Sequence, residues 1–560
     1  MKRLSLLSTW LLIMILTVLS PIAVAETLSL PDITYQAGSE GETISLWELG
    51  NNYYFLFLPS FADLTALSLQ LGDEPAVLTA ADQSITISSG EPFDLTSLYS
   101  EIPSDGVYPF TLSRDSESIF ANAIVSGNIG SMYITSADPE NAGKKYVEET
   151  KGNKASGQIT LLRADGSTVY TGELKQIKGR GNTTWGYPKK PYQIKLREKI
   201  DLLETGDSDE AASTWILLAN YWDRSLFRNA LTYDLAAELG LAYSPNSRSV
   251  DLYYDGKYRG TYLLCEKTEV ATGRVDIHNL EKDFEKANAE VEDFDELPTE
   301  GGDKPYQYVM GLNDPDDLSG GYLLELDFPN RAKAEKSYFV TDRDYYVVSK
   351  SPEYLSENAI VYIREFYQEF EDAVFNGGVN PKTGKSYTDY VDLESLAKCH
   401  AIFELVQNAD AYRSSTFFYK PAGEEKLYAG PVWDFDSAYG LYDAHYEDTM
   451  LASKLTSLGQ ALMKIPSFCQ AVEDVYQNEI YPLINDIVLN PDTSAAAGHV
   501  RSIANYSEEL ALSFRMGSVL WTDPSPMEYD VAVEFLRDFI ARRNEFLYNL
   551  HWETALSSEG

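Results

Sequence analysis

The stretch from Lys175 to Lys199 constrains the fold most, because it places a glycine-bearing basic turn inside an acidic chain. It holds eight basic residues and one acidic residue, whereas the 560-residue chain has 45 Lys and Arg, 86 Asp and Glu and a formal net charge of −41. Gly179 and Gly181 flank Arg180 in this stretch. Glycines let a backbone approach a ligand closely, and loop N–H groups and basic side chains attract anions. The pattern is typical of either a phosphate-binding turn or a solvated basic hairpin.

A strand that carries a lysine is predicted directly after this turn. From Tyr192 to Arg197 the side chains alternate between apolar and polar, as in a strand with one buried face. Tyr192, Ile194 and Leu196 would face a core, and Lys195 would lie on the opposite face. The turn and the strand together would present positive charge beside a flexible backbone.

The first 25 residues are typical of an export signal. A basic start precedes a mostly apolar run from Leu6 to about Leu19, and Ala23-Val24-Ala25 fits a cleavage site. The run is short for a membrane span, so we expect a secreted or cell-surface protein with no stable membrane span after cleavage. The strong negative charge of the chain argues against nucleic acid as a partner.

Cysteine and histidine offer little for a metal site or a disulfide framework. The three cysteines, Cys265, Cys399 and Cys469, lie far apart and have no metal-type spacing. An exported protein permits disulfides, but an odd number of cysteines defines no framework. The five histidines are scattered singly, so neither a His-rich zinc site nor a histidine-based triad is favoured.

Residues 26–128 are expected to form a separate all-β domain. Short strand-like segments follow one another with turn residues between them: Thr43–Trp47, Tyr53–Leu58, Ser84–Ser88 and Tyr108–Leu112. This spacing predicts an immunoglobulin-like sandwich of about 100 residues. Residues 126–131 have the composition of a linker to the next region.

Residues 129–552 are expected to form an α+β region. Its first part, about 129–275, combines strands with a helix between Asp223, a candidate N-cap, and Gly240, a candidate residue after the C-terminus. Residues 281–319 are acidic and lack apolar periodicity, which predicts an insert or a mobile loop. From about 320 to 552 the pattern is mainly helical, with helices expected near 357–375, 392–408 and 531–548 and a strand pair at 416–420 and 426–429.

Three carboxylates are predicted to converge at this strand pair. Asp410 precedes the outgoing strand, and Asp434 and Asp436 follow the returning strand, which brings the chain back close to its start. Carboxylates gathered in this way ligate a cation or divide into a base and a metal ligand. Taken singly, each has a structural alternative: a helix cap for Asp410 and turn formation for Asp434 and Asp436. Combined with the basic stretch, they point to nucleotide, Mg²⁺ and phosphoryl transfer.

Several separated motifs resemble the spore-coat CotH family, and they occur in the expected order over roughly residues 130–550. The motifs are Lys178-Gly179-Arg180-Gly181-Asn182, Pro188-Lys189-Lys190-Pro191-Tyr192, Asp223-Arg224-Ser225, Tyr258-Arg259-Gly260-Thr261-Tyr262-Leu263, Asn408-Ala409-Asp410 and Gly430-Pro431-Val432-Trp433-Asp434-Phe435-Asp436. The resemblance implies a two-lobed, atypical protein-kinase-like domain with a helical C-terminal lobe. It also implies binding of ATP with Mg²⁺ or Mn²⁺, and phosphorylation of serine in a protein substrate. The β-rich region before residue 129 lies outside the resemblance.

The resemblance implies roles for individual residues. Those that would cover or bind the nucleotide are Lys178, Gly179, Arg180, Gly181, Asn182, Lys195 and Glu266, with Glu266 and Lys267 resembling the hinge that holds adenine. Asp410 resembles the catalytic aspartate, and Lys195 resembles the catalytic lysine that pairs with nucleotide phosphates. Asp434 and Asp436 would bind the metal. Asp234 or Glu238 would orient Lys195, and Lys189 and Lys190 are further candidates for phosphate binding.

The chain departs from ordinary kinases at two of these places. Asp436 stands where the metal-binding motif of ordinary kinases ends in glycine. Ser415 stands five residues after Asp410, where an asparagine would be expected. Asp436 and Ser415 are therefore both candidates for the second metal ligand.

Three functions remain compatible with the sequence. The first is an exported kinase of the CotH type, and the second is a non-catalytic surface or scaffold protein that kept the fold. The third is a secreted carbohydrate-active enzyme that uses paired carboxylates. The retention of Lys195, Asp410 and Asp434 favours the kinase, whereas the scarcity of ATP outside cells argues against it. The oligomeric state is not indicated by the sequence.

Overall fold

The computed structural model describes residues 33–38, 42–104, 106–441, 449–492, 499–522 and 528–556. The predicted export signal at residues 1–25 lies outside these ranges. Two compact units are present: one is built from residues up to 124, and the other comprises 125–560 together with the short segments 38–42 and 59–61. Within the ranges just given, no helix is both long enough and apolar enough to cross a membrane.

The first unit is β-rich, as predicted. Its main sheet has the order β3-β4-β10-β9-β6-β7, and β1–β2 and β5–β8 form two small two-stranded sheets. The strands are β1 Thr34–Gln36, β2 Thr43–Ser45, β3 Trp47–Gly50, β4 Tyr53–Leu58, β5 Leu67–Ser68, β6 Ala76–Ala80, β7 Gln83–Ile87, β8 Pro92–Phe93, β9 Val107–Arg114 and β10 Glu117–Val125. An immunoglobulin-like pairing of two packed sheets stays a prediction, because the strand order gives one six-stranded sheet and two ribbons.

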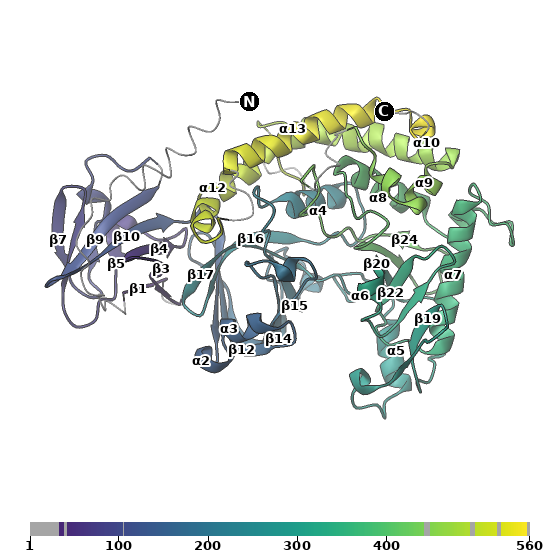
Figure 1. The fold of residues 1–560 in the computed structure, drawn as a ribbon, viewed down its shortest axis with the longest axis horizontal. Coiled ribbons are helices and arrows are strands. Elements are labelled where there is room, and N and C mark those ends of the chain that lie inside the picture. Colours follow the sequence, from purple (N-terminus) through teal and green to yellow (C-terminus); the bar gives the residue numbers. More distant parts are fainter. Residues whose placement is uncertain are drawn as a thin grey trace. The chain divides into compact units, whose positions relative to one another are not determined.

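A closed seven-stranded barrel opens the second unit (Figure 1). Its order is β11-β12-β13-β14-β15-β17-β16, and closure leaves no free sheet edge. The strands are β11 Gly130–Ser136, β12 Lys154–Leu162, β13 Thr168–Gly179, β14 Tyr192–Ile200, β15 Ala212–Leu218, β16 Ser247–Tyr254 and β17 Lys257–Glu266. Tyr192, Ile194 and Leu196 are buried among the barrel's apolar residues, which confirms the predicted alternation along β14.

The expected linker at residues 126–131 is instead part of the packed structure. Ser126 and Ser131 are buried, and β11 begins at Gly130. Ser126 donates a hydrogen bond to the fully buried carboxylate of Asp251 on β16. A composition rich in Ser, Gly and Asn was compatible with a linker, but here the small side chains let the chain pass through a crowded polar core.

Asp251 is the centre of that polar core. Its carboxylate also accepts hydrogen bonds from Tyr258 at 2.8 Å, from Thr261 at 3.0 Å and from Ser513 at 3.0 Å. Burial raises the pKa of Asp251, whereas the hydroxyl donors act in the opposite direction. Ser513 belongs to α12, Ile503–Leu520, so one side chain joins the start of the unit, the barrel and a C-terminal helix.

A seven-stranded sheet forms the other half of the second unit (Figure 1). Its order is β18-β19-β21-β22-β20-β23-β24. The strands are β18 Thr299–Glu300, β19 Tyr306–Val309, β20 Tyr322–Asp327, β21 Tyr338–Val340, β22 Tyr346–Ser351, β23 Thr416–Lys420 and β24 Tyr428–Ala429. From residue 320 to 552 the chain carries β20 to β24 and is otherwise mainly helical, as predicted, and a kinase-like division into lobes stays a prediction.

The helices follow the predicted periodicity closely. They include α4 Arg228–Glu238, α7 Glu357–Phe375, α8 Leu393–Leu405 and α13 Tyr529–Tyr548. The prediction for α7 is confirmed at both ends, and Asp392 caps α8 through the backbone N–H of Ser395. Helix α7 packs against β19 and β21, and α13 packs against α8 and α12 (Figure 1).

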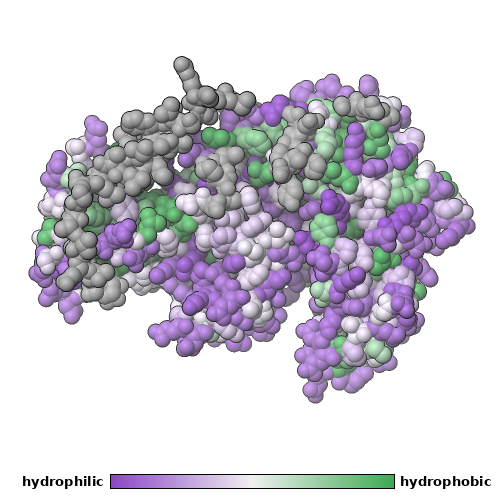
Figure 2. All heavy atoms as spheres, viewed as in Figure 1, coloured by the Kyte–Doolittle hydropathy of each residue, from purple (hydrophilic) through white to green (hydrophobic). Residues whose placement is uncertain are grey.

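Residues 281–319, predicted to be an insert or a mobile loop, contain short regular elements, so the loop alternative holds only for part of the segment, and the insert stays a prediction. The segment contains most of α5, Leu280–Ala287, and the strands β18 and β19. Leu280 and Phe284 lie one helical turn apart and are buried, Glu281 and Asp283 are half-buried, and Glu285 is exposed. The sequence did not indicate this helix, because only two of its eight residues, Leu280 and Phe284, are buried and most of the others are charged. Figure 2 shows the hydrophilic surface over this part of the sheet and over the barrel.

Replacing Asp251 should destabilise the second unit strongly. Asp251→Ala leaves the hydroxyls of Ser126, Tyr258, Thr261 and Ser513 without their acceptor, at a cost of about 3 kcal/mol or more of unfolding free energy. Asp251→Asn keeps one acceptor oxygen and should cost less. Urea unfolding of both variants, compared with Asp316→Ala at an exposed position, measures the difference. An unchanged unfolding midpoint for Asp251→Ala would contradict the proposed role of Asp251.

Candidate functional site

The glycines of the basic turn are required by its own side chains. Gly181 has a φ of 81°, in the left-handed region, and a Cβ there would lie 2.2 Å from Oγ1 of Thr184. A Cβ on Gly179 would lie 2.1 Å from the ring of Trp185. The backbone N–H of Arg180 donates to the carbonyl oxygen of Pro191. The turn is therefore folded back on itself, and glycine allows Trp185 and Thr184 to lie against the backbone.

The basic residues of the stretch do not form one phosphate-binding surface. Arg197 pairs with Glu173, and Lys190 donates to the carbonyl oxygen of Trp185 while lying over its ring. Lys189, a candidate for phosphate binding, is buried and donates to the carbonyl oxygen of Thr261. The residues that remain available near the turn are Lys178, Arg180 and Lys195.

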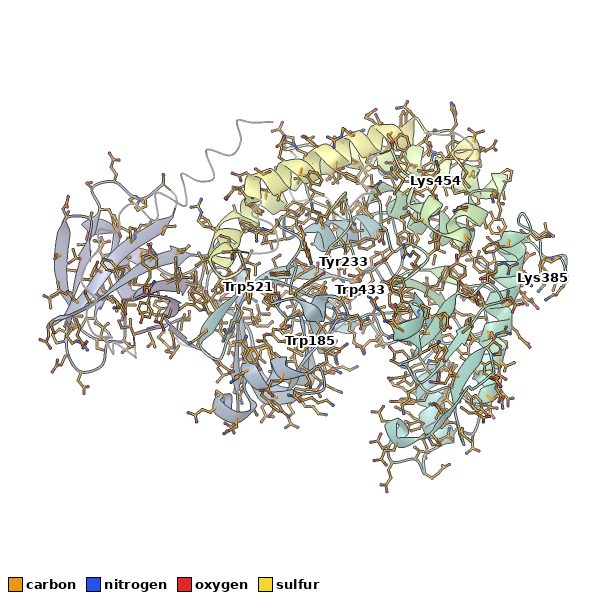
Figure 3. All side chains as sticks on the ribbon, in the orientation of Figure 1. Trp185, Tyr233, Lys385, Trp433, Lys454 and Trp521 are labelled. Atoms are coloured by element: carbon orange, nitrogen blue, oxygen red, sulfur yellow. The ribbon has the colours of Figure 1, made fainter. Side chains whose placement is uncertain are left out.

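Arg180 joins the turn to the segment that carries Asp434. Its guanidinium lies 5.5 Å from the ring centroid of Trp433, a cation–π distance. Trp433 in turn stacks on Tyr233 of α4, with ring centroids 5.7 Å apart. Tyr233 and Trp433 are labelled side by side in Figure 3. The basic turn of the barrel and the aspartate segment of the C-terminal half are thus brought to one place.

Helix α4 holds the Asp434 segment through its backbone. Asn229 accepts a hydrogen bond from the N–H of Phe435 at 2.7 Å, and Thr232 bonds to the hydroxyl of Tyr439. Asn229 and Tyr233 are one turn apart and face the same segment. Sequence reasoning missed these residues, because a polar residue on an otherwise apolar helix face carried no motif.

The three predicted carboxylates do converge. Asp410 and Asp434 are close enough that the charge of Asp434, after burial, raises the pKa of Asp410 to about 6. The pKa of Asp436 is raised to about 7 by burial, and then by the charge of Asp434. Ser415 donates a hydrogen bond to Asp434 at 3.2 Å. Asp410, Asp434, Asp436 and Ser415 therefore form one electrostatic cluster, called the carboxylate cluster below.

Two residues of this cluster have unusual backbones. Asp434 has a φ of 72° and Ser415 a φ of 52°, both in the left-handed region. A non-glycine residue in this region costs on the order of 1–3 kcal/mol and concentrates at functional sites. With these backbone conformations, the side chains of Ser415 and Asp434 point toward each other and form their hydrogen bond.

The sheet adds groups that sequence reasoning did not assign to the site. Asp327, at the end of β20, accepts from Ser414 at 2.8 Å and pairs with Arg331 at 3.4 Å. Glu325 on the same strand is nearly buried beside Lys350, and burial raises its pKa to about 7, with the charges of Asp327 and Asp434 acting in the same direction. Both acids were visible on a predicted strand, but nothing in the sequence indicated that β20 pairs with β23 beside Asp410.

Lys195 lies on the outer face of β14, between Gln176 and Thr214 on the neighbouring strands. The two carboxylates expected to orient it are used elsewhere. Asp234 accepts from the hydroxyl of Tyr506, and Glu238 accepts from the backbone N–H of His499 at 2.8 Å. Over the ranges that the structure covers, Lys195 makes no ion pair, so the predicted Lys–carboxylate pair is wrong.

Lys178 occupies the same outer face of the barrel, across from Gln193. Its pKa is lowered, first by burial and then by the charges of Lys154 and Lys267. Glu353, just after β22, acts in the opposite direction. This face of the barrel is thus directed at the seven-stranded sheet, where Figure 2 shows the visible surface indented between the two.

Glu266 and Asn182 have partners within the protein. Glu266 is buried, pairs with Arg274 at 2.8 Å and accepts the backbone N–H of Asn246 at 2.9 Å. Burial raises the pKa of Glu266 to about 8. Asn182 is exposed, with its Oδ1 3.4 Å from Nζ of Lys151. The Glu266 side chain therefore stabilises the end of β17, and its part in nucleotide binding stays a prediction.

The carboxylate cluster fits a magnesium ion bound together with phosphate. Mg²⁺ usually takes one or two protein carboxylates, the rest of its ligands being water and phosphate oxygens. Asp434 and Asp410 would supply hard oxygen ligands, and a cation would offset both the burial and the charge of Asp434 that raise the pKa of Asp410. Within the described portion of the chain, no group of three or more Asp, Glu, His or Cys side chains could hold a metal ion, so metal binding stays a prediction.

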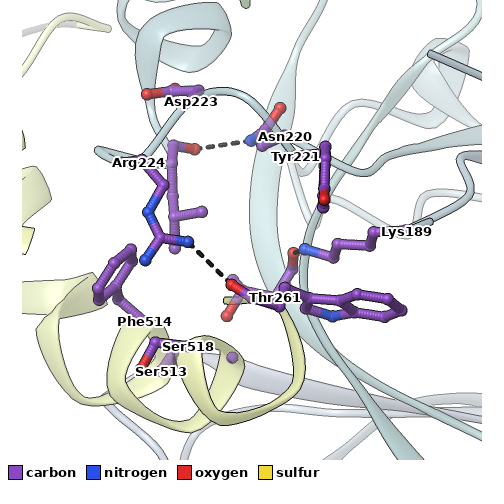
Figure 4. Close-up of a pocket in the computed structure, with 12 residues that line it drawn as sticks. Lys189, Asn220, Tyr221, Asp223, Arg224, Thr261, Ser513, Phe514 and Ser518 are labelled. Atoms are coloured by element: carbon purple, nitrogen blue, oxygen red, sulfur yellow. Dashed lines mark hydrogen bonds between the residues drawn. The ribbon is translucent and has the colours of Figure 1, made fainter. Parts of the chain in front are cut away.

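A pocket lies apart from the carboxylate cluster, around Lys189 (Figure 4). Arg224 reaches into it from the turn before α4, donates to the carbonyl oxygen of Trp521 at 3.1 Å and lies over the ring of Phe514. Burial lowers the pKa of Lys189 to about 7, and the charge of Arg224 acts in the same direction. This pocket is small and belongs to the packing of α12 against the barrel.

Comparison with protein families identifies the chain. The family described as CotH kinase protein matches residues 177–547. The match spans most of the second unit, from the strand before the basic turn to α13, so the chain belongs to the CotH kinase family. A search of curated proteins found no match.

The buried Lys189 should make stability depend on pH. Below about pH 7 the lysine is charged in both states, and its burial then costs free energy. Between pH 7 and the unfolded pKa of about 10.4 the folded state loses the proton first, so stability rises with pH, by at most about 1.4 kcal/mol per pH unit.

Melting curves of the wild type and Lys189→Met between pH 6 and 9.5 test this expectation. The wild type should gain stability relative to the variant as the pH rises. Lys175→Met, at an exposed position on β13, is the control and should show no such trend. Parallel pH profiles of the wild type and Lys189→Met would contradict the assignment.

Proposed function

We propose that this CotH-family protein is an extracytoplasmic protein kinase that transfers the γ-phosphoryl group of ATP to serine hydroxyls with Mg²⁺ or Mn²⁺. The observation that carries the proposal is the meeting of opposite charges from distant parts of the chain. Arg180 lies on Trp433, next to Asp434, and Asp434 lies beside Asp410. Phosphoryl transfer needs both a positive surface for phosphates and carboxylates for the metal and the acceptor.

Each group has a role that follows from its position. Asp434, held by Ser415 and by the α4 contacts, would ligate the metal. Asp410 would accept or orient the proton of the serine hydroxyl, since its raised pKa brings it nearer to the range of a general base. Arg180 and Lys178 would neutralise phosphate oxygens from the barrel side. The metal, when bound, would offset charge on the phosphates.

A direct assay tests the proposal. The purified protein is incubated with labelled ATP, Mg²⁺ or Mn²⁺ and a serine-containing peptide library, and the products are hydrolysed to identify the phosphorylated amino acid. Phosphoserine that depends on the metal supports the proposal. Absence of labelled peptide and of labelled protein with both metals would overturn it.

Substitution of Asp434 should weaken ATP binding, whereas substitution of Asp410 should lower turnover. Asp434→Asn removes a charged metal ligand, so metal-dependent ATP binding should weaken. Asp410→Asn should leave ATP binding close to normal and lower turnover by roughly 10²–10⁴-fold, because general-base help is lost. ATP titrations with and without Mg²⁺, turnover and melting curves of both variants measure the difference, with Asp316→Asn at an exposed site as control.

Two outcomes would contradict these roles. Full activity in folded Asp434→Asn protein would exclude the metal role. A lower melting temperature with unchanged activity per folded molecule would show that the aspartates act only as caps and turn residues.

A second candidate function is a non-catalytic binding protein on the same fold. The observation that favours it is the engagement of Asp234 and Glu238 by Tyr506 and His499, which leaves Lys195 without the carboxylate that would orient it. Such a protein would be stabilised by ATP and Mg²⁺ in melting experiments and would release no labelled product.

The variant Lys195→Ala tests whether Lys195 contacts the nucleotide. The core face of β14 stays intact, so the melting temperature should change little. If Lys195 meets the nucleotide phosphates, the affinity for ATP should fall about tenfold, the scale of one charge-assisted contact. Lys175→Ala is the matched control on β13, and isothermal titration gives both affinities. Equal affinities for wild type and Lys195→Ala would remove Lys195 from the site.

A further inference from the structure

One aromatic ring holds two guanidinium groups next to Asp410. Phe328 follows β20 directly, and Arg331 lies on the short helix α6, Pro329–Ala332. The guanidinium of Arg331 lies 5.0 Å from the ring centroid of Phe328, and that of Arg413 lies 5.5 Å from it. Both distances are typical of cation–π contacts. The charges of both arginines lower the pKa of Asp410 against the effect of burial, so both lie within its electrostatic reach.

Arg331 is fixed by partners from three segments. It pairs with Asp327 at 3.4 Å, donates to Ser414 at 3.0 Å and donates to Thr183 of the basic turn at 3.1 Å. Its position is therefore set by the site itself, and it serves as a fixed positive charge behind Phe328.

Arg413 is held in place but keeps its donors free. Its backbone N–H donates to the carbonyl oxygen of Asp410 at 2.9 Å, which ties it to the turn that carries Asp410. Its side chain is exposed. Where the structure describes the chain, that guanidinium has no ion pair or hydrogen bond, although the protein has 86 acidic residues. A guanidinium has five N–H donors arranged to bind a carboxylate or a phosphate in a bidentate manner.

The position of Arg413 separates it from the nucleotide side of the site. The groups assigned to the phosphates, Arg180 and Lys178, come from the barrel. Arg413 belongs to the turn of Asp410, which is the residue assigned to the acceptor hydroxyl. An anion bound to Arg413 would therefore belong to the acceptor substrate.

We propose that Arg413, with Phe328 and Arg331 behind it, forms a subsite that binds an acidic side chain of the polypeptide substrate next to the acceptor serine. This rests on the proposed kinase function. The ligand is a carboxylate or a phosphate group on the peptide, because both match the guanidinium. The substrate class is thus serine peptides with glutamate, aspartate or phosphoserine close to the acceptor.

Peptide kinetics test the subsite. A serine peptide is made in versions that carry glutamate, phosphoserine, lysine or glutamine at each of three positions on either side of the serine. The full-length wild type should phosphorylate the best acidic version with a KM about tenfold lower than the glutamine version, the scale of one bidentate charge-assisted contact. Arg413→Gln should lose this preference, so that the KM values of the acidic and glutamine versions become equal. Because the charge of Arg413 also lowers the pKa of Asp410, the two peptide versions are compared within each variant. Arg413→Lys should recover part of it, because charge remains but the planar fork is lost.

Arg537→Gln is the matched control. Arg537 is also exposed, lies on α13 and pairs with Glu534, so the variant changes the net charge equally away from Asp410. Its peptide preference should equal that of the wild type. If Arg537→Gln reduces the preference as much as Arg413→Gln, overall charge explains the effect and the subsite is rejected.

Binding of the same peptides, measured by fluorescence anisotropy with Mg²⁺ and a non-hydrolysable ATP analogue, separates the two proposals. Tighter binding of acidic peptides that is lost in Arg413→Gln, without any phosphorylation, supports the subsite and overturns the kinase function. Phosphorylation without acidic preference, or an acidic preference that Arg413→Gln retains, overturns the subsite alone. If the protein neither phosphorylates nor binds any of the peptides, both proposals are overturned. The glutamate and phosphoserine arms show which anion the subsite takes.

Discussion

The buried ion pair between Asp223 and Arg228 is the interaction on which the candidate site depends. Both side chains are buried, and the same carboxylate accepts the backbone N–H of Arg228 at 2.8 Å and that of Ser225 at 2.9 Å. Asp223 therefore neutralises the buried charge of Arg228 and accepts hydrogen bonds from backbone N–H groups at the start of α4 that would otherwise lack a partner. Breaking such a pair by removing one partner typically costs about 3–5 kcal/mol. Because α4 then carries Asn229 and Tyr233, the orientation of the Asp434 segment follows from this pair.

The site shows how an acidic chain can concentrate positive charge where it is needed. Most cations near the site are already engaged: Lys190 with Trp185, Arg197 with Glu173 and Lys350 with Glu325 and Glu335. Arg180 and Arg413 are instead guanidiniums held on aromatic rings, those of Trp433 and Phe328. An aromatic support positions a cation without cancelling its charge, whereas a carboxylate support would neutralise it. Anionic ligands could therefore be bound beside carboxylates that themselves repel anions.

The sequence predicted the elements of the second unit better than their assembly. The spacing of apolar residues predicted the first and last residues of α7 and the alternation along β14, because each of these elements buries one face against a core. The convergence of Asp410 and Asp434 also followed from the sequence, since a hairpin separates them and local geometry returns the chain. The predicted partner of Lys195 failed because Asp234 and Glu238 lie on a face of α4 whose direction depends on contacts with residues more than 250 positions away.

Burial was equally hard to predict for charged residues. Lys189 was a candidate for phosphate binding because it lies in a basic run, yet it is buried beside Thr261 of β17 and Trp521, which follows α12. Asp327 and Arg331 had no motif, and their importance appears when β20 pairs with β23. Local pattern defines a helix or a strand, but the partner of a polar side chain is set by long-range topology, which one sequence does not determine.

The contact between Thr183 and Arg331 bears on how a ligand would enter and leave. It is one hydrogen bond, exposed to solvent, between the basic turn of the barrel and the segment that follows β20. A single exposed hydrogen bond contributes about 1 kcal/mol, and its rupture needs no repacking of the core. Movement of the turn away from the carboxylate cluster would also break the cation–π contact between Arg180 and Trp433, so two contacts hold the turn beside the cluster. Entry and exit of a bound molecule past this turn would therefore depend on both contacts.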